Sequence, residues 1–394
     1  MSSIIGHVRY STSLKVTSDS DVLLSEAQPF QTEYFSLVHN GNIPFHIYNR
    51  LKEEYSLGNS VNTNSDTELI TKLLPKLGNT IEEQLIKFLT VVKGVYCLLL
   101  ITKNALYVVR DAYGVRPLMI CSTPNYIHIS SEHSIHYLNA VNQDLKKIEI
   151  PPNSIWKISE NNIHKVLTRG KTPLKHFCSF EMIYFMDRFT VVYNKTVEEI
   201  RFKLGESIGK QEENIPKKEN AVVVGCPNTA IPAGKGFAYS TGLPYYQLIH
   251  KKKDCGRTFI LPSNNQRIEY CSKRIFIEHE KVKGKEVYII DDSIVRGNTS
   301  KSIISKLRQA GATKVHFRVI SPPVRNPCHY GIDFPTHEEL IGYNKTEKEI
   351  GNNIGADSIR YCSLENMKKI MDGGKNTLCS SCFDGIYNEQ LMDW

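Results

Sequence analysis

Residues 287–300, VYIIDDSIVRGNTS, join an apolar run to a polar loop and the start of a helix. The run 287–290 is β-branched or aromatic and follows a turn at Gly284, as in a central strand of a parallel sheet covered on both faces. After the loop, Thr299 can cap a helix that ends before Gly311 and whose apolar residues repeat at helical spacing: Ile303, Ile304, Leu307 and Ala310. The pattern predicts a strand–loop–helix unit of an open α/β sheet.

The loop of this unit carries the groups that phosphate sites use. Ligands of open α/β sheets bind at the carboxyl ends of the strands, and a helix N-terminus offers N–H groups to a phosphate. Gly297 allows a close backbone approach, and Arg296 supplies a positive charge. Hydroxyl groups come from Ser293, Thr299 and Ser300. Asp291 and Asp292 would repel a phosphate, so we expect them to bind ribose hydroxyls or Mg²⁺. A plain turn with two surface acids is the alternative, and the combination of features favours a phosphate site.

The decapeptide 291–300 resembles the phosphoribosyl pyrophosphate (PRPP) loop of type I phosphoribosyltransferases, in the wording of the amidophosphoribosyltransferase family. The resemblance continues through CGRTFILP at 255–262 and HYGIDFPTHEELI at 329–341, and it covers nearly the whole chain. It implies an enzyme of purine biosynthesis. Nitrogen from glutamine or ammonia would displace pyrophosphate at C1 of PRPP and give 5-phosphoribosylamine.

Length and composition are those of an ordinary two-domain protein. The chain has 394 residues, and we expect domains at 1–170 and 171–394. The formal net charge is +8, and the Lys and Arg residues are interspersed with 41 acids instead of forming one basic stripe. This distribution favours phosphorylated small molecules as ligands and no nucleic-acid partner. Neither a run of about 18 apolar residues nor a signal peptide is found, so we expect a cytoplasmic protein without a membrane partner. The ten cysteines are then expected to be thiols or metal ligands instead of disulfides.

Short alternating segments in the first domain predict strands, at 4–10, 34–39, 92–102, 105–110, 117–121 and 127–131. Residues 66–77 and 80–89 predict helices, the first capped by Ser65. Strands with interposed helices predict a sandwich of two sheets flanked by helices. By resemblance this is an αββα glutaminase of the N-terminal nucleophile type, incomplete at its start, followed by a doubly wound parallel phosphoribosyltransferase sheet.

Polar motifs at the predicted strand ends resemble those of the family's glutaminase domain. Individually each has an ordinary explanation, such as a hairpin turn or a helix cap. The resemblance implies Arg9 for the substrate carboxylate, Asn40 and Gly41 for the oxyanion hole, and Asp66 for the substrate α-amino group. The chemistry agrees, because a guanidinium binds a carboxylate bidentately and N–H groups stabilise an oxyanion.

The family's nucleophile, a Cys at the mature N-terminus, has no counterpart in this sequence. The first Cys is Cys97, inside an apolar strand where a small buried thiol is the ordinary interpretation. We therefore expect the chain as written to lack glutaminase activity and to use free ammonia. We also expect the native protein to begin upstream, at a Cys that processing exposes.

A second strand–loop–helix unit runs through the strand 221–225, the loop CPNT and the helix 231–240, after a helix at 196–210. By resemblance its loop holds pyrophosphate, with the Thr229 hydroxyl at Mg²⁺ beside Asp291 and Asp292; Asn228 stands where the family has an acid. Residues 254–273 resemble the flap that closes over PRPP and excludes water. The resemblance implies that Arg257 and Arg267 bind PRPP. It also implies that Lys273 and Arg274 act in catalysis together with Asp291 and Asp292.

Four cysteines match the [4Fe–4S] ligands of the cluster-containing branch of the family: Cys178, Cys328, Cys379 and Cys382. Spacing alone leaves the matter open, because a single CxxC is compatible with half a zinc site, a redox pair or chance. Four converging thiolates would suit Fe–S or Zn²⁺, and four unrelated buried thiols are the alternative.

An alternative of another class is a non-catalytic PRPP or nucleotide sensor. Three departures from the family motivate this alternative: the absent nucleophile, Asn228, and the sequence FMDRFT at 185–190, where the family has FARPDS. Retention of Asp291 and Asp292 argues for the enzyme. Purine nucleotides as inhibitors and a homotetramer are what the resemblance implies for partners.

Overall fold

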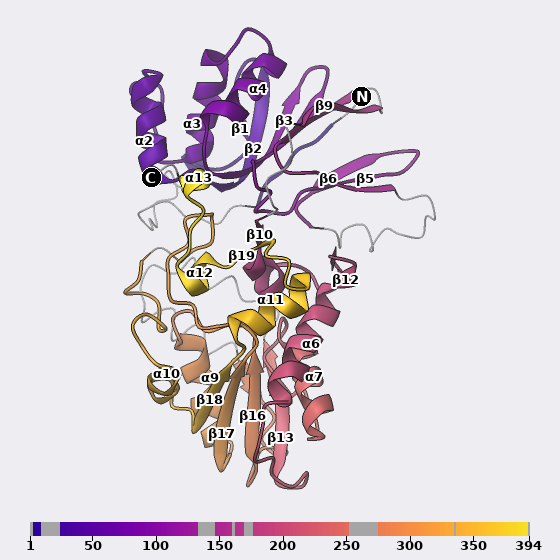
Figure 1. Ribbon diagram of the computed structural model, residues 1–394, viewed down its shortest axis with the longest axis vertical. Coiled ribbons are helices and arrows are strands. Elements are labelled where there is room, and N and C mark those ends of the chain that lie inside the picture. Colours follow the sequence, from indigo (N-terminus) through magenta and orange to yellow (C-terminus); the bar gives the residue numbers. More distant parts are fainter. Residues whose placement is uncertain are drawn as a thin grey trace.

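The computed structural model describes residues 3–8, 24–132, 146–159, 162–168, 176–251, 275–334 and 336–392. The N-terminal half, with its antiparallel sheets, lies above the C-terminal half, with its parallel sheet (Figure 1). The division at 170/171 falls outside the described residues and stays a prediction.

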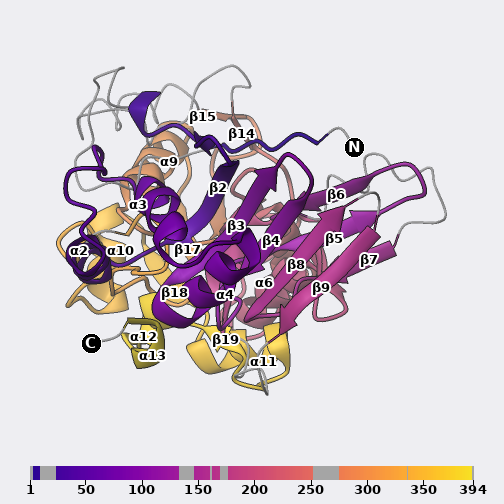
Figure 2. The same ribbon diagram turned by 90° about the horizontal axis from the view of Figure 1, so that it is seen from above.

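The N-terminal half contains two antiparallel sheets. The larger has the order β1 (Phe30–Gln31), β2 (Phe35–Asn42), β3 (Val95–Thr102), β4 (Leu106–Arg110), β8 (Ser154–Ser159) and β9 (Asn162–Thr168). Figure 2 shows β2, β3, β4, β8 and β9 side by side. The smaller has the order β6 (Ile127–Ser130), β5 (Met119–Ser122), β7 (Lys146–Glu149). Helices α2 (Phe45–Glu54), α3 (Asp66–Leu73) and α4 (Ile81–Val91) pack on one face of the larger sheet, whose other face packs on the smaller. The predicted sandwich is confirmed.

Local predictions in this half fail where no partner or cap forms. The strand predicted at 4–10 is wrong over residues 3–8, which pair with no described strand and leave Ile4 95% exposed. Ser65 occupies the N-cap of α3 but makes no capping hydrogen bond through its side chain. Helix α2 was not predicted, because its apolar residues form only a short stripe. The structure shows that this stripe, Ile47, Tyr48 and Leu51, is the buried side of the helix. The predicted helix at 66–77 continues as the 3₁₀ turn η1 (Leu74–Lys76).

The C-terminal half is built on a parallel sheet, β13 (Ala221–Gly225), β16 (Glu286–Asp291), β17 (Lys314–Val319) and β18 (Ser358–Tyr361) in that order. Helices α6 (Val197–Gly209), α7 (Ile231–Thr241) and α11 (Leu364–Asp372) cover one face. Helices α9 (Asn298–Gln309) and α10 (Glu347–Ile354) cover the other. Alternate residues of β16 therefore face opposite cores, which explains why the whole run 287–291 is buried. The doubly wound sheet is confirmed.

Several short elements lie between the two halves or at their margins. Strands β10 (Phe177–Cys178) and β19 (Leu378–Cys379) pair in parallel, and they are followed by the π-helical turn η2 (Glu181–Phe185) and α12 (Ser381–Asp384), respectively. The hairpins β11 (Val191–Val192) to β12 (Lys195–Thr196) and β14 (Ile249–Lys251) to β15 (Ile275–Ile277) complete the strands. Helix α13 (Glu389–Met392) returns to the N-terminal half, where Gln390 bonds to Tyr113 and Met392 to His46. One apolar core unites the two halves, because Val95 and Val115 belong to it together with residues of α6 and α7.

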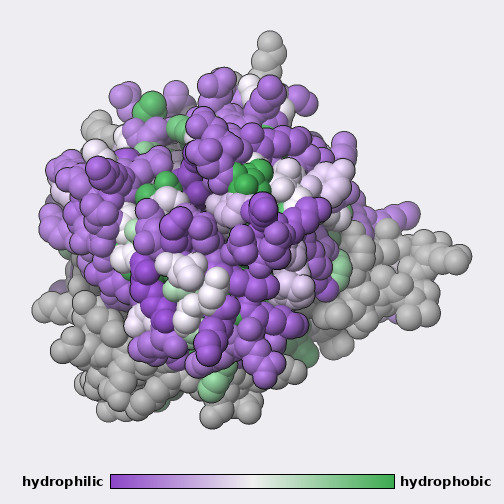
Figure 3. All heavy atoms as spheres, turned by 90° about the horizontal axis from the view of Figure 1, so that it is seen from below, coloured by the Kyte–Doolittle hydropathy of each residue, from purple (hydrophilic) through white to green (hydrophobic). Residues whose placement is uncertain are grey.

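The surface at the far end of the C-terminal half is mainly hydrophilic, with small separate hydrophobic groups (Figure 3). In the described part of the chain, no helix combines the length and the apolar character that crossing a bilayer requires.

Candidate functional site

The loop between β16 and α9 ends in a glycine with left-handed backbone. Gly297 has φ +81° and is the N-cap of α9, a conformation that Gly adopts without strain. A Cβ at this position would lie 2.5 Å from Cδ1 of Ile341. The prediction that Thr299 caps the helix is therefore wrong, because the loop ends earlier and Thr299 lies in the first turn.

Asp291 and Asp292 are buried, only 8% and 6% exposed, which excludes the alternative of two surface acids. The hydroxyls of Thr229 and Ser293 donate hydrogen bonds to Asp292, the latter at 2.6 Å. Neither carboxylate forms an ion pair with a Lys or Arg of the described ranges. Burial, with the neighbouring Asp292, raises the pKa of Asp291 to about 8, and burial also raises the pKa of Asp292. Burial therefore makes it unfavourable for both carboxyl groups to ionise together, and a cation bound beside them would favour the ionised form.

The loop after β13 lies beside this pair, as the sequence predicted. The backbone N–H of Cys226 donates to the carbonyl of Ile290 at 2.8 Å, which holds the two strand ends together. Gln247 donates to the carbonyl of Gly225 at 3.1 Å and fixes the start of the loop. Sequence reasoning missed Gln247, because no local pattern relates it to a loop that lies 22 positions away in the chain. Thr229, Asp291 and Asp292 therefore converge at one edge of the sheet.

Arg296 faces two acids, Glu339 and Asp333. Its Nε donates to Glu339 at 2.7 Å, and its Nη2 lies 3.8 Å from Asp333. The same stretch binds the loop through its backbone, since the N–H of Ile341 donates to the carbonyl of Val295 at 2.8 Å. Ser300 is buried and Ser293 is half-buried within the site. The role of Arg296 in phosphate binding stays a prediction.

Three of the four residues predicted to bind glutamine lie at the end of β2 and the start of α3: Asn40, Gly41 and Asp66. Asn40 and Gly41 pair with Cys97 and Tyr96 of β3, and a Cβ on Gly41 would lie 2.0 Å from the carbonyl oxygen of Val95. Asp66 accepts a hydrogen bond from the N–H of Ile43 at 3.1 Å and lies 3.4 Å from His39 Nδ1. Although burial opposes it, the charge and hydrogen bond of His39 and the bond from Ile43 lower the pKa of Asp66. A carboxylate that stays ionised here suits an α-ammonium group.

The remaining predicted residues lie outside the described residues: Arg9, Arg257, Arg267, Lys273 and Arg274. Cys97 is buried, and burial raises the pKa of its thiol to about 12. Its thiol is thus poorly suited to act as a nucleophile, as the sequence indicated.

Comparisons with known proteins agree with this geometry. Residues 12–137 match the glutamine amidotransferase domain family. The amidophosphoribosyltransferase of Methanocaldococcus jannaschii is 34% identical over 413 residues, which cover 98% of this chain and 83% of the relative. The amidophosphoribosyltransferase of Bacillus subtilis is also 34% identical, and the match covers 98% of this chain and 80% of the relative. The chain belongs to the amidophosphoribosyltransferase family.

Solved structures support the same assignment. The glutamine PRPP amidotransferase of B. subtilis in complex with ADP and GMP superposes with a TM-score of 0.82 at 32% identity, over 97% of this chain and 82% of that one. A structure described as the allosteric regulatory enzyme of purine biosynthesis has a TM-score of 0.83 at 32% identity, over 97% and 81%. The predicted combination of a glutaminase-type sandwich with a phosphoribosyltransferase sheet is confirmed.

The four family-matched cysteines lie on segments that meet between the two halves of the chain. Cys178 and Cys379 are partners in the β10–β19 pair, and the carbonyl of Cys382 accepts bonds from the N–H groups of Arg325 and Asn326 beside Cys328. Burial raises the pKa of Cys382 well above its ordinary value, and Cys328, Cys379 and Cys178 raise it further. The eight cysteines of the described ranges are all free thiols, and no three His, Cys, Asp or Glu side chains there form a group that could hold a single metal ion.

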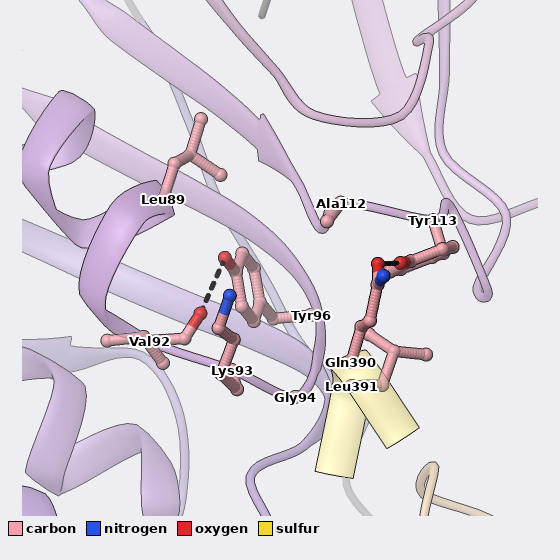
Figure 4. Close-up of a pocket in the computed structure, with 9 residues that line it drawn as sticks. All are labelled: Leu89, Val92, Lys93, Gly94, Tyr96, Ala112, Tyr113, Gln390 and Leu391. Carbon is pink, nitrogen blue, oxygen red and sulfur yellow. Dashed lines mark hydrogen bonds between the residues drawn. The ribbon is translucent and has the colours of Figure 1, made fainter. Parts of the chain in front are cut away.

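A cavity of about 130 Å³ is lined by Tyr96, the β3 partner of Gly41, and by residues around it (Figure 4). It is enclosed by the end of α4, the start of β3, the Ala112–Tyr113 turn and helix α13. The Tyr96 hydroxyl donates to the carbonyl of Val92 at 3.4 Å, and the Tyr113 hydroxyl donates to Gln390. None of the predicted site residues lines it, so the predicted PRPP and glutamine sites lie outside this cavity.

Proposed function

We propose that this chain catalyses the amidophosphoribosyltransferase reaction, in which nitrogen from ammonia or glutamine displaces pyrophosphate from C1 of PRPP. The observation that carries the proposal is the buried pair Asp291 and Asp292, at the junction of two strand-end loops. Burial makes ionisation of the pair unfavourable, and a cation bound beside the two carboxyl groups would favour their ionised form. The product, 5-phosphoribosylamine, is the first intermediate of purine biosynthesis.

Each loop has a distinct role in this proposal. The loop 293–300 holds the 5′-phosphate at the N-terminus of α9, where N–H groups and the helix dipole favour an anion. Asp291 and Asp292 bind the ribose hydroxyls, and Thr229 with its loop holds pyrophosphate. Arg257 and Arg267 stay predicted to bind PRPP, and Lys273 and Arg274 stay predicted to act in catalysis; all four lie outside the described residues. The two loops hold C1 of PRPP in place. Once ammonia has bound beside it, the displacement becomes effectively unimolecular.

Magnesium fits the residues at this edge. Asp291, Asp292 and Thr229 offer only oxygen atoms, the donors that this hard cation prefers. When bound, Mg²⁺ would offset part of the negative charge of the departing pyrophosphate. The carboxylates hold the ribose, and their position at the buried strand ends excludes water from one side of the sugar.

An iron–sulfur cluster is the proposed cofactor at Cys178, Cys328, Cys379 and Cys382. A zinc ion requires sulfur atoms roughly 4 Å apart, since each Zn–S bond is about 2.3 Å. A cubane cluster takes one thiolate per iron, and the four thiols lie close enough for Cys178 and Cys382 to have their pKa raised by the other cysteines. Protein purified without oxygen should contain iron and labile sulfide. Zinc without sulfide would replace the cluster by a structural zinc site.

The decisive experiment incubates the protein with PRPP, Mg²⁺ and ammonium and measures pyrophosphate. Release that depends on all three supports the enzyme. If pyrophosphate release is no faster than in a variant with Asp291→Asn and Asp292→Asn, the non-catalytic sensor becomes the better interpretation. The comparisons give the sensor no support, because the relatives that match along the chain carry the enzyme's name.

Partners and location follow from the same proposal. The B. subtilis relative was solved with ADP and GMP, and we propose that purine nucleotides bind and inhibit this chain. A homo-oligomer, with a tetramer as the expected form, can be tested by light scattering. A cytoplasmic location can be tested by cell fractionation.

A further inference from the structure

His39 lies on β2, one residue before Asn40. It follows Leu37 by two positions and therefore faces the same side of the strand, toward the core under helices α2, α3 and α4. Its backbone N–H donates to the side chain of Gln28 at 2.7 Å, and the Gln28 amide donates to the Thr67 hydroxyl at 2.9 Å. His39 is only 3% exposed, so its ring is enclosed between β2 and the first turn of α3.

Both ring nitrogens of His39 face oxygen atoms. Nδ1 lies 3.4 Å from a carboxylate oxygen of Asp66, and Nε2 lies 3.4 Å from the carbonyl oxygen of Val95. A Cβ on Gly41 would lie 2.7 Å from the same Nε2, so the ring is packed directly against this glycine. A carboxylate and a carbonyl only accept hydrogen bonds, so a ring that bonds to both carries a proton on each nitrogen. Such a ring is positively charged, and it joins Asp66 to the backbone around Gly41.

The carboxylate of Asp66 is held from two sides. One oxygen faces His39 Nδ1, and the other accepts a hydrogen bond from the N–H of Ile43 at 3.1 Å. Burial raises the pKa of Asp66, but the charge and hydrogen bond of His39, together with bonds from Ile43 and Thr67, lower it overall. The Asp66 side chain is 23% exposed and the His39 side chain only 1%. A ligand can therefore reach Asp66, while His39 lies behind it.

We propose that His39 is a positioning residue: it holds the Asp66 carboxylate at the end of β2, where the α-ammonium group of glutamine would bind, and it acts on glutamine only through Asp66. Without the ring, the oxygen that faces His39 loses its charged partner, and the carboxylate can turn away from the end of β2. A carboxylate that must be ordered when its ligand binds gives a lower affinity than one that is already fixed. This inference rests on the proposed function, because it requires glutamine to bind at Asn40, Gly41 and Asp66.

Equilibrium dialysis of the full chain with labelled L-glutamine, in the presence of Mg²⁺ and PRPP, tests the proposal. We expect His39→Leu to raise the Kd for glutamine at least about tenfold, because a hydrogen bond to a charged group is lost. His39→Asn keeps an N–H at the position of Nδ1, and its Kd should stay within about threefold of that of the unmodified protein. His164→Leu replaces an exposed histidine of the same half, on β9, and this control should leave the Kd unchanged.

A double-mutant cycle separates positioning from a general structural role. Asp66→Asn should itself weaken glutamine binding. Adding His39→Leu to it should change the Kd by less than about twofold, because the carboxylate that His39 positions is already gone. If His39→Leu does not fold, His39→Gln takes its place, since its amide keeps a donor near Val95 and lacks one near Asp66.

Three results would overturn the inference. An effect of His39→Leu below about threefold would show that Asp66 needs no positioning by this ring. A further loss of about tenfold on top of Asp66→Asn would show that His39 acts independently of Asp66. Absence of glutamine binding to the unmodified protein would remove the glutamine site and the inference with it. Ammonium-dependent release of pyrophosphate, measured on the same samples, then shows whether the phosphoribosyl transfer of the proposed function still stands.

Discussion

Replacement of Asp291 by Asn should stabilise the ligand-free protein while it abolishes catalysis. Burial and the adjacent Asp292 raise the pKa of Asp291 to about 8, from an ordinary value of 3.8. Between these values the folded protein holds a proton that the unfolded chain has released. Stability therefore falls as pH rises through this window and is recovered in acid. Asn has nearly the shape of the protonated acid and carries no such charge.

The magnitude follows from the displacement of the pKa. Each pKa unit corresponds to about 1.4 kcal/mol, so the ionised Asp291 costs the folded state on the order of 5 kcal/mol at pH 9. Relaxation of the site reduces this, and we expect Asp291→Asn to gain about 2–4 kcal/mol in free energy of unfolding at pH 9. The gain should vanish near pH 4. Ammonia-dependent turnover should fall at least about 100-fold, because the ribose and Mg²⁺ contacts are lost.

Urea unfolding at pH 5, 7 and 9 without Mg²⁺ measures the effect, with turnover recorded in parallel. The exposed Glu219→Gln provides a control in which a surface charge is removed and little change is expected. A variant less stable than the unmodified protein at every pH would refute the argument that the pair is buried without a compensating cation. Retained turnover would refute the catalytic role.

Three further perturbations test other parts of the fold. Cys382→Ser should bleach the brown colour expected of the anaerobically purified protein and lower its iron content and Tm, whereas unchanged iron would contradict the ligand set. Gly205→Ala should cost about 1–3 kcal/mol in urea unfolding, because its Cβ would lie 1.9 Å from the carbonyl oxygen of Ala233; Gly58→Ala, with no atom within 4 Å, is the control, and equal midpoints would contradict the close helix packing. Glu181→Gln should cost about 3–5 kcal/mol, because it leaves buried Arg116 without the partner that lies 2.8 Å away, and an unchanged Tm would show that this pair contributes nothing.

Elements with a strong local pattern were predictable from the sequence. The strands β13 and β16 are continuous apolar runs, which is the pattern of strands buried on both faces. Helices α4 and α6 carry capping boxes at Thr80 and Thr196, and both lie close to their predicted positions. The resemblance then related the loops after these strands to a known chemistry. Residue identity was sufficient here, because backbone periodicity and caps act over a few residues.

Tertiary structure alone decided the environment of each functional group. The sequence could not show that Asp291 and Asp292 are buried, since that depends on helices from both sides of the sheet. It could not pair Arg296 with Glu339, 43 positions away, or bring Gly331 against Gly41. Residues 3–8 have an alternating pattern but no paired strand in the described chain, so the pattern did not become structure. Desolvation and charge depend on neighbours in space, and local sequence contains no record of them.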